Sequence, residues 1–216
     1  MRLNLENINR LIQHPMSLRA FLLGSKIKNY EDVLVMMGLL KEKPKTFIDA
    51  GGGNGDYIKI MKNLIPTCKI YSFDPVPSYN GEEIKKIALS DKNEIEDFYV
   101  EDNKLGSSFL EHKGKTKKIK VESKRFDSLG IKIEKPAILK IDVEGAELKV
   151  LNGFGKVLED IDVIQIEYVF DRSYNKTYDL GEAIKLLNKF GFYNFIQRVI
   201  RYKDGKLLNC DLVFWK

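Results

Sequence analysis

Residues 45–64 have the sequence KTFIDAGGGNGDYIKIMKNL, in which a short apolar run, a glycine-rich turn and a segment of helical periodicity follow one another. The apolar run Thr46-Phe47-Ile48 is β-prone and ends at Asp49, and a second β-prone run, residues 69–73, ends at Asp74-Pro75. Between them, the apolar and aromatic residues of 56–64 recur at helical spacing. A strand, a turn, a helix and a second strand in this order predict a right-handed βαβ unit that begins an α/β domain.

The glycine-rich turn contains Gly51, Gly53 and Gly55, which lack a Cβ and let the backbone pass close to a ligand. A dinucleotide fingerprint, GxGxxG, needs one more glycine at position 56, but this chain has Asp56 there, where a carboxylate would disfavour a pyrophosphate. The pattern that fits is DxGxGxG with Asp74 at the end of the next strand, because a carboxylate there suits the two hydroxyls of a ribose. S-adenosylmethionine has a ribose and a positively charged sulfonium but no phosphate, so the pattern favours that cofactor. A tight turn with a locally capping Asp is the structural alternative.

A second group of polar residues follows the strongest predicted strand, residues 137–143, which we expect to be buried on both faces of a parallel sheet. Asp142 and Glu144 stand two positions apart and therefore point to the same side of an extended chain. They lie at the carboxyl edge of the sheet, where open α/β sheets bind ligands. Lys140 within the strand needs a partner, since a lone buried charge is costly.

The remaining pattern completes an α/β fold. Residues 1–43 are predicted to be mainly helical, and the Asp204-Gly205 pair between two β-rich runs predicts a C-terminal antiparallel hairpin. We therefore expect a doubly wound sheet with this hairpin, and two parts: an N-terminal helical extension, residues 1–43, and one domain, residues 44–216. Further strands are predicted over 84–90, 95–100, 119–123 and 163–168, and further helices over 146–158 and 179–190.

The composition is that of an ordinary globular protein. The 216 residues include 36 basic and 31 acidic ones, a net charge of +5, and 44% are hydrophobic, which argues against wholesale disorder and collagen-like or low-complexity chains. Apolar runs are too short for a spanning helix, and the first residues lack the apolar core of a secretory signal. Cys68 and Cys210 form no CxxC motif, so we expect neither a disulfide framework nor a thiolate zinc site, and we predict a reducing, cytoplasmic location.

Five ordered segments together resemble the FkbM family of S-adenosylmethionine-dependent methyltransferases. The resemblance runs from about residue 45 to residue 168, and its most specific part is the segment KIDVEGAE that begins at Lys140. It implies the seven-stranded class I methyltransferase sheet, and methyl transfer to hydroxyls of sugars, polysaccharides or natural products. The segments are Phe47-Ile48-Asp49-Ala50-Gly51, Ser72-Phe73-Asp74-Pro75, Ile87-Ala88-Leu89-Ser90-Asp91, Arg125-Phe126-Asp127-Ser128-Leu129 and Leu139-Lys140-Ile141-Asp142-Val143-Glu144-Gly145-Ala146-Glu147.

The resemblance also assigns residues to parts of the cofactor. It implies that Asp142 and Glu144 face the sulfonium and the acceptor, and that Asp74, followed by Pro75, binds the ribose. The chain departs from the usual pattern at Gly53-Asn54, where the family has Asn and then an apolar residue, and at Asp74, where Glu is commoner. The other implied cofactor residues are those of the methionine-side loop, Asp49, Gly51, Gly53, Asn54 and Gly55, and those that border the adenine, Ala88, Leu89 and Ser90.

Transfer to a hydroxyl also requires removal of its proton. The sulfonium is already a strong methyl donor, so the protein must chiefly align the acceptor oxygen and provide a general base. We expect Asp142 or Glu144 to be this base, with Glu167 and His112 as lesser candidates. Carboxylates could instead hold magnesium, but no histidine lies near them in the sequence, and we predict no metal.

Two other functions remain open. Seven basic residues between Lys113 and Arg125 are typical of a solvated loop, but they also leave nucleic-acid methylation as an alternative, although two carboxylates at the site would repel phosphates. The second alternative, left open by the altered glycine loop, is a non-catalytic binding protein. The acceptor, a small molecule or glycan, and the oligomeric state are not specified by the sequence.

Overall fold

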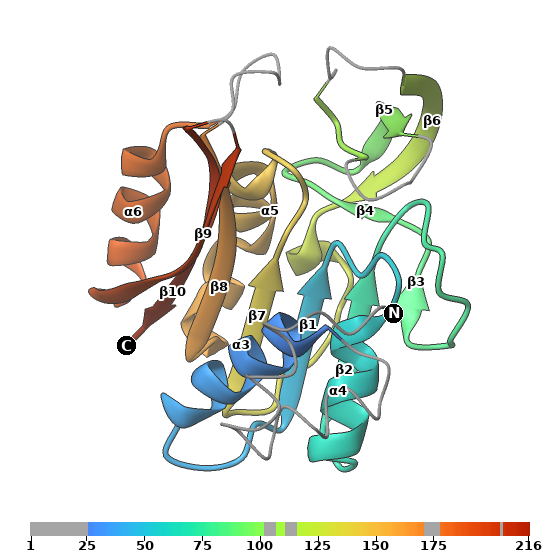
Figure 1. The fold of residues 1–216 in the computed structure, drawn as a ribbon. Coiled ribbons are helices and arrows are strands. Elements are labelled where there is room, and N and C mark those ends of the chain that lie inside the picture. The colour runs from blue at the N-terminus through green and yellow to red at the C-terminus, as the bar shows by residue number, and fades with distance from the viewer. Residues whose placement is uncertain (1–25, 102–106, 111–115, 171–177, 204) are drawn as a thin grey trace.

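The main sheet has seven strands in the order β3-β2-β1-β7-β8-β10-β9 (Figure 1). The computed structural model describes residues 26–101, 107–110, 116–170, 178–203 and 205–216. The first five strands of this order are parallel, whereas β10 runs antiparallel to both β8 and β9, which confirms the predicted sheet and its C-terminal hairpin. The strands are β1 (Thr46–Ala50), β2 (Lys69–Phe73), β3 (Ile84–Lys85), β7 (Ala137–Ile141), β8 (Val163–Val169), β9 (Asn194–Lys203) and β10 (Lys206–Trp215).

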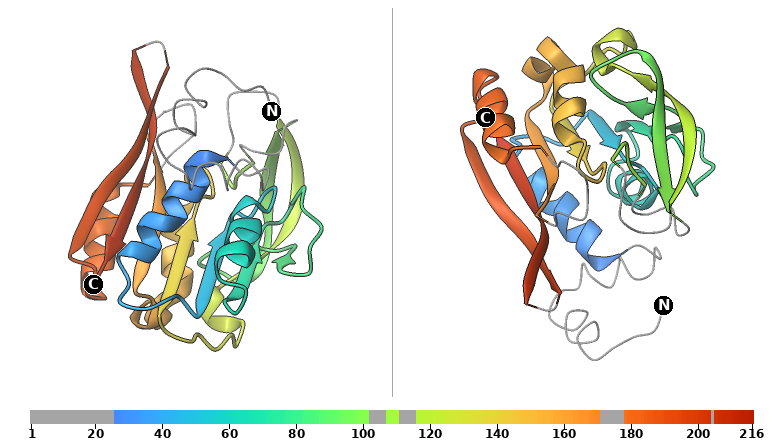
Figure 2. Two further views of the ribbon diagram at one scale, coloured as in Figure 1. Left: turned by 60° about the horizontal axis from the view of Figure 1, so that its bottom comes forward. Right: turned by 90° about the horizontal axis from the view of Figure 1, so that it is seen from above.

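Helices cover both faces of this sheet (Figure 2). Side chains alternate along a strand, so Phe47 of β1 packs under α3 and α4, whereas its neighbour Ile48 packs under α5. Each face therefore has its own buried core, as a doubly wound sheet requires. The helices are α3 (Ile27–Gly38) and α4 (Asp56–Leu64) on one face, and α5 (Glu147–Phe154) and α6 (Leu180–Lys189) on the other, with the short 3₁₀ helices η1 (Phe126–Ser128) and η2 (Gly155–Asp160).

A second, three-stranded sheet lies beyond the C-terminal ends of β1 and β2 (Figure 1). Its order is β4-β6-β5, with bounds Ala88–Leu89 for β4, Glu94–Glu101 for β5 and Thr116–Lys124 for β6. The single strand predicted over residues 84–90 is therefore wrong. Residues 84–85 pair with β2 in the main sheet, and residues 88–89 pair with β6 in the small one, because the chain leaves one sheet edge and joins another within three residues.

The helix predicted over residues 146–158 is shorter than expected. It ends at Phe154, because Gly155 has a φ of 52°, and the chain continues as η2. In the part of the chain that the structure describes, no helix has the length and apolarity needed to cross a membrane. The division into residues 1–43 and 44–216 stays a prediction, because residues 1–25 lie outside the described ones.

Candidate functional site

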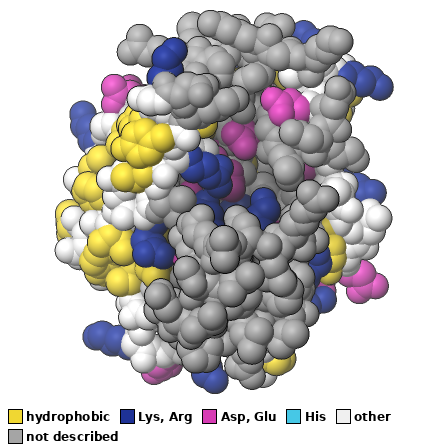
Figure 3. Space-filling view, in the orientation of Figure 1, with side chains coloured by type: hydrophobic (Ala, Val, Ile, Leu, Met, Phe, Trp, Pro, Cys, Tyr) yellow, Lys and Arg dark blue, Asp and Glu magenta, His cyan; other side chains and the backbone are white. Residues whose placement is uncertain are grey.

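A cavity of about 230 Å³ opens at the C-terminal ends of β1, β2, β7 and β8. The space-filling view, drawn in the orientation of Figure 1, shows acidic and basic side chains in a central hollow (Figure 3). Three predicted residues, Asp49, Gly55 and Ser90, do not line the cavity, and His112 lies outside the described residues. The predicted residues that do line it are Gly51, Gly53, Asn54, Asp74, Pro75, Ala88, Leu89, Asp142, Glu144 and Glu167.

The glycines of the β1–α4 turn serve different purposes. Gly51 has a φ of 87°, and a Cβ there would lie 1.8 Å from the backbone oxygen of Asp142, so this glycine lets the loop pass the end of β7. Gly55, with a φ of 73°, precedes α4 and packs against the ring of Tyr79. At Gly53, by contrast, a Cβ would meet nothing within 4 Å. Gly53 is therefore the glycine whose surroundings leave room for a ligand.

Asp74, directly after β2, is fixed by two backbone donors. Its Oδ2 accepts from the N–H of Gly53 at 2.9 Å, and its Oδ1 accepts from the N–H of Val76 at 2.8 Å. Burial raises the pKa of Asp74, although these two hydrogen bonds lower it. The carboxylate thus faces the cavity in a defined orientation, with its remaining lone pairs able to accept from a ligand hydroxyl.

The other end of the cavity is apolar. Ala88 and Leu89 line it, as do the rings of Phe98 and Phe109, which meet edge to face at a centroid distance of 5.4 Å. The sequence analysis missed Phe98, because this residue reaches the site through β5 of the second sheet. Ser90 is buried next to this wall and donates to Glu96 instead.

Lys140 lies beneath the glycine loop, in the centre of the main sheet. It is 3% exposed, its Nζ lies 3.1 Å from Oδ1 of Asp49, and it donates to the backbone oxygen of Gly51 at 3.0 Å. Burial alone would lower the pKa of Lys140, but the charges of Asp49 and Asp142 outweigh burial and raise it. The buried lysine that the sequence left unexplained thus joins β1, β7 and the loop, and Asp49 is its partner rather than a lining residue.

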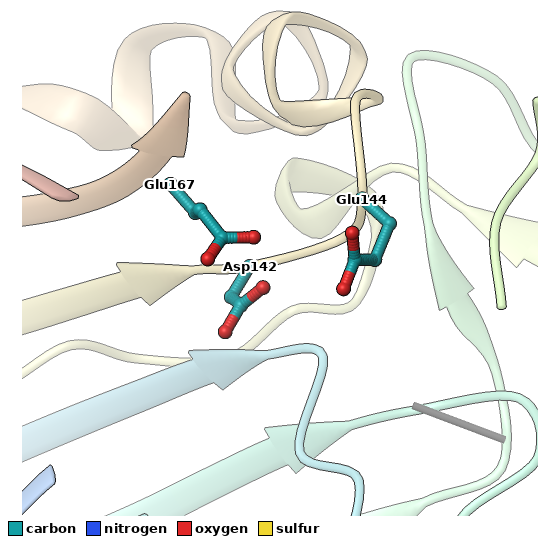
Figure 4. A group of neighbouring side chains, drawn as sticks. All are labelled: Asp142, Glu144 and Glu167. Atoms are coloured by element: carbon teal, nitrogen blue, oxygen red, sulfur yellow. The ribbon is translucent and has the colours of Figure 1, made fainter. Parts of the chain in front are cut away.

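Three carboxylates converge at the ends of β7 and β8 (Figure 4). One oxygen each of Asp142, Glu144 and Glu167 lies within 4.8 Å of the other two. Burial raises the pKa of Asp142, but Lys140 and then Lys28 outweigh burial and hold it below its usual range. Burial, followed by the charges of Asp142 and Glu144, raises the pKa of Glu167. The surroundings of this pair therefore favour the ionised form of Asp142 more than that of Glu167.

Glu144 has an unusual backbone. Its φ of 55° is the one positive value at a non-glycine residue in the described part of the chain. The Oγ of Ser108, which is 1% exposed, donates to the backbone oxygen of Glu144 at 2.8 Å. Because a left-handed conformation is costly for a residue with a Cβ, the surrounding structure must hold it, and such residues cluster at functional sites.

Basic side chains from two distant elements complete the cavity, and the sequence analysis did not single them out. Lys28 of α3 lies 2.7 Å from Oδ2 of Asp211, and Arg201 of β9 lies 3.4 Å from Oε1 of Glu167. Neither residue belongs to a local motif. They reach the site because α3 and the C-terminal hairpin flank the same edge of the sheet.

Glu147, at the start of α5, should make stability depend on pH. Its Oε1 accepts from the backbone N–H groups of Val143 and Gly145, and burial raises its pKa to about 8 from 4.5. Because the folded state favours the protonated form, the stability that Glu147 contributes is fully present below pH 4.5 and is lost as pH rises through about 8. Glu147→Gln keeps an acceptor oxygen but cannot ionise. The melting temperature of this variant minus that of the parent should therefore be larger at pH 8 than at pH 5.

Thermal unfolding of both proteins at the two pH values measures this effect. Glu122→Gln, which changes a carboxylate with 49% of its side chain exposed, is the matched control and should give a smaller change with pH. A Glu147→Gln difference that is equal at pH 5 and pH 8 would contradict the assignment.

The strand order, with β10 alone reversed, is the arrangement of class I S-adenosylmethionine-dependent methyltransferases. Within that class, residues 49–193 match the family model described as the methyltransferase FkbM domain. Because this match spans more than half of the chain, the protein belongs to the FkbM methyltransferase family, and S-adenosylmethionine is its cofactor.

The solved structures to which this chain is similar are distant in sequence. Human N-acetylserotonin methyltransferase in complex with S-adenosylmethionine is 15% identical, with a TM-score of 0.39, and the match covers 88% of this chain and 52% of that one. EvdMO1 is 9% identical, with a TM-score of 0.42, and the match covers 88% of this chain and 41% of that one. This chain therefore spans about half the length of these proteins or less. A comparison with curated protein sequences finds no match.

Proposed function

We propose that this protein transfers the methyl group of S-adenosylmethionine to a hydroxyl of a sugar, a polysaccharide or a natural-product-like acceptor. The observation that carries this proposal is the position of the Asp142 carboxylate at the cavity wall, beside Glu144 and next to the glycine loop. A hydroxyl must lose its proton as it is methylated, and a carboxylate within reach provides the base.

The residues of the cavity fit the cofactor. The fixed carboxylate of Asp74 suits the two ribose hydroxyls, and the open space at Gly53 leaves room beside it. The apolar wall of Ala88 and Leu89, to which we add Phe98 and Phe109, suits the adenine ring. Asp142 and Glu144 suit a positively charged sulfonium, because opposite charges attract strongly in a partly buried site.

The chain's own residues then have distinct tasks. The bound cofactor supplies an activated methyl group. Asp142 or Glu144 accepts the proton of the acceptor hydroxyl, while the cavity walls hold the hydroxyl oxygen in line with the bond that breaks. Glu167, whose pKa is raised by burial and which lies 3.4 Å from Arg201, is better suited to orienting the acceptor than to removing its proton. We further propose a cytoplasmic location, supported by Cys68 and Cys210, which are both free thiols.

Two measurements test the proposal. Calorimetry should detect binding of S-adenosylmethionine and S-adenosylhomocysteine to the purified protein. Incubation with the ¹³C-methyl cofactor and a panel of glycans and polyhydroxylated natural products should give ¹³C signals of methyl ethers. Label found only on nitrogen atoms or in RNA would overturn the acceptor class. Failure to bind either ligand would favour a non-catalytic protein.

A further inference from the structure

We propose that Asp142, Glu144 and Glu167 form a binding site for a hard divalent cation such as Mg²⁺, Mn²⁺ or Ca²⁺. The proposal goes beyond methyl transfer, because the site would bind the cation without cofactor or acceptor. The three carboxylates offer one oxygen each, all within 4.8 Å of one another, and all three residues line the cavity. Oxygen-only ligands are those that hard cations prefer, and such a site needs no histidine.

The spacing suits such an ion. Ca²⁺ binds oxygen at about 2.3–2.6 Å, so three ligands spread evenly around it in one plane are about 4.0–4.5 Å apart. Mg²⁺, which binds at about 2.0–2.1 Å, would draw the carboxylates closer together than Ca²⁺ does. Three side chains leave further positions for water and for acceptor oxygens in the cavity. The donor set thus defines an open site.

Each ligand is held by a different element. Asp142 follows β7 directly, and Glu167 lies in β8, the next parallel strand, so both approach from the carboxyl edge of the sheet. Glu144 reaches the same point through its left-handed backbone, which Ser108 stabilises from the other side of the cavity. Figure 4 shows the carboxyl groups of Glu144 and Glu167 turned toward Asp142 from two sides. The convergence is therefore built by the fold and does not depend on long surface side chains.

Glu167 gives an independent indication of a missing partner. The residue is 3% exposed, and its Oε1 accepts from Nδ2 of Asn209 at 3.0 Å. Its Oε2 is buried and has no hydrogen-bond partner among the described residues. A buried oxygen without a partner is costly, and a cation bound between the three side chains would supply one, displacing the proton that the raised pKa of Glu167 favours.

Among the described residues, the basic side chains near the three carboxylates also contact other groups. Lys140 lies closer to Asp49, at 3.1 Å, than to Asp142, at 3.6 Å. Lys28 pairs with Asp211, and Arg201 approaches the other oxygen of Glu167. Lys140 and Lys28 thus pair mainly with carboxylates outside the group, and the three carboxylates of the group line the cavity.

A cation at this point would contribute to the proposed reaction. Coordination lowers the pKa of a hydroxyl and fixes its oxygen. An acceptor hydroxyl bound to the cation would lie beside Asp142, and a carboxylate that coordinates through one oxygen keeps the other to accept the proton. This consequence depends on the proposed function, whereas cation binding itself does not.

Titration of the purified full chain with Mn²⁺, followed by calorimetry and by electron paramagnetic resonance, tests the site without cofactor or acceptor. We expect one site per chain, with Mg²⁺ and Ca²⁺ as competitors. Glu144→Gln and Glu167→Gln should each weaken Mn²⁺ binding at least about tenfold, since loss of even an outer-shell partner of a metal site typically costs 10–100-fold. Two variants are used because Glu167 is buried and its replacement could affect folding, which a melting curve without metal would reveal.

Asp97→Asn is the matched control, because it removes a carboxylate from the second sheet that pairs with Lys118 and Lys120 away from the cavity. It should leave Mn²⁺ affinity unchanged. The site is ruled out if Mn²⁺ fails to bind at millimolar concentration, or if the three variants bind it equally. A parallel titration with S-adenosylhomocysteine separates the two proposals, since the methyltransferase assignment predicts binding of that ligand whether or not a cation binds.

Discussion

Replacement of Lys140 with Met should lower the free energy of unfolding by about 3–5 kcal/mol, because removal of one partner of a buried ion pair leaves an uncompensated charge. Asp49 would lose the ammonium at 3.1 Å and keep only the Oγ of Ser72, at 3.4 Å, as a side-chain donor. For a chain of this length, such a loss corresponds to a fall in melting temperature of about 6–20 °C. Methionine has a similar volume, so the effect would report the lost charge rather than a cavity.

Lys69→Met is the matched control. Lys69 also lies on a strand of the main sheet and pairs with Glu134 at 2.6 Å, but 57% of its side chain is exposed. Water and salt already screen that pair, so its loss should change the melting temperature little. The double variant Asp49→Asn with Lys140→Met removes both charges and should recover part of the loss. If Lys140→Met lowers the melting temperature no more than Lys69→Met, the buried pair does not stabilise the fold as argued.

The main sheet could be predicted because its signals are local. The glycine turn between two β-prone runs predicts β1, α4 and β2, and the buried run at 137–143 predicts β7. The Asp-Gly pair predicts the hairpin of β9 and β10. In each case the periodicity or turn chemistry of a short segment decides its structure, and β1 with β2, like β9 with β10, are neighbours both in the sequence and in the sheet.

The second sheet could not be predicted in the same way. Residues 84–90 have the composition of one strand, and nothing local indicates that the chain changes sheets between Lys85 and Ala88. The partners that decide it lie outside this segment, in β2 and β6. Phe98 reaches the cavity through β5 of this sheet, so its place in the site could not be predicted either.

The acidic residues of the site could be predicted from local sequence, whereas the basic residues could not. Asp142 and Glu144 follow one strand, so a pattern of a few residues identifies both. Lys28 and Arg201, in contrast, come from elements more than 170 residues apart and meet only in the folded protein. Sequence reasoning thus finds the residues that approach a cofactor from the sheet edge, and misses those that α3 and β9 bring from the sides.

Asp74→Ala should weaken binding of S-adenosylhomocysteine at least about 100-fold. We propose that this carboxylate accepts from both ribose hydroxyls, and a hydrogen bond to a charged group contributes about 1.5–3 kcal/mol. Two such bonds together correspond to a factor of about 10²–10⁴ in the dissociation constant. The geometry supports the assignment because the N–H groups of Gly53 and Val76 hold the two carboxylate oxygens at the cavity wall.

Calorimetric titration of the parent, Asp74→Ala and Asp74→Asn measures this effect. Asparagine keeps one acceptor oxygen in a similar position, so the affinity of Asp74→Asn for S-adenosylhomocysteine should lie between those of the parent and Asp74→Ala. A general collapse of the loop would not produce this order. Asp97→Ala removes a carboxylate from the second sheet and should bind as the parent does. Melting curves recorded with each titration exclude unfolding. Parent-like affinity in Asp74→Ala would mean that the ribose lies elsewhere, and the positions assigned to the adenine and the methyl group would have to move with it.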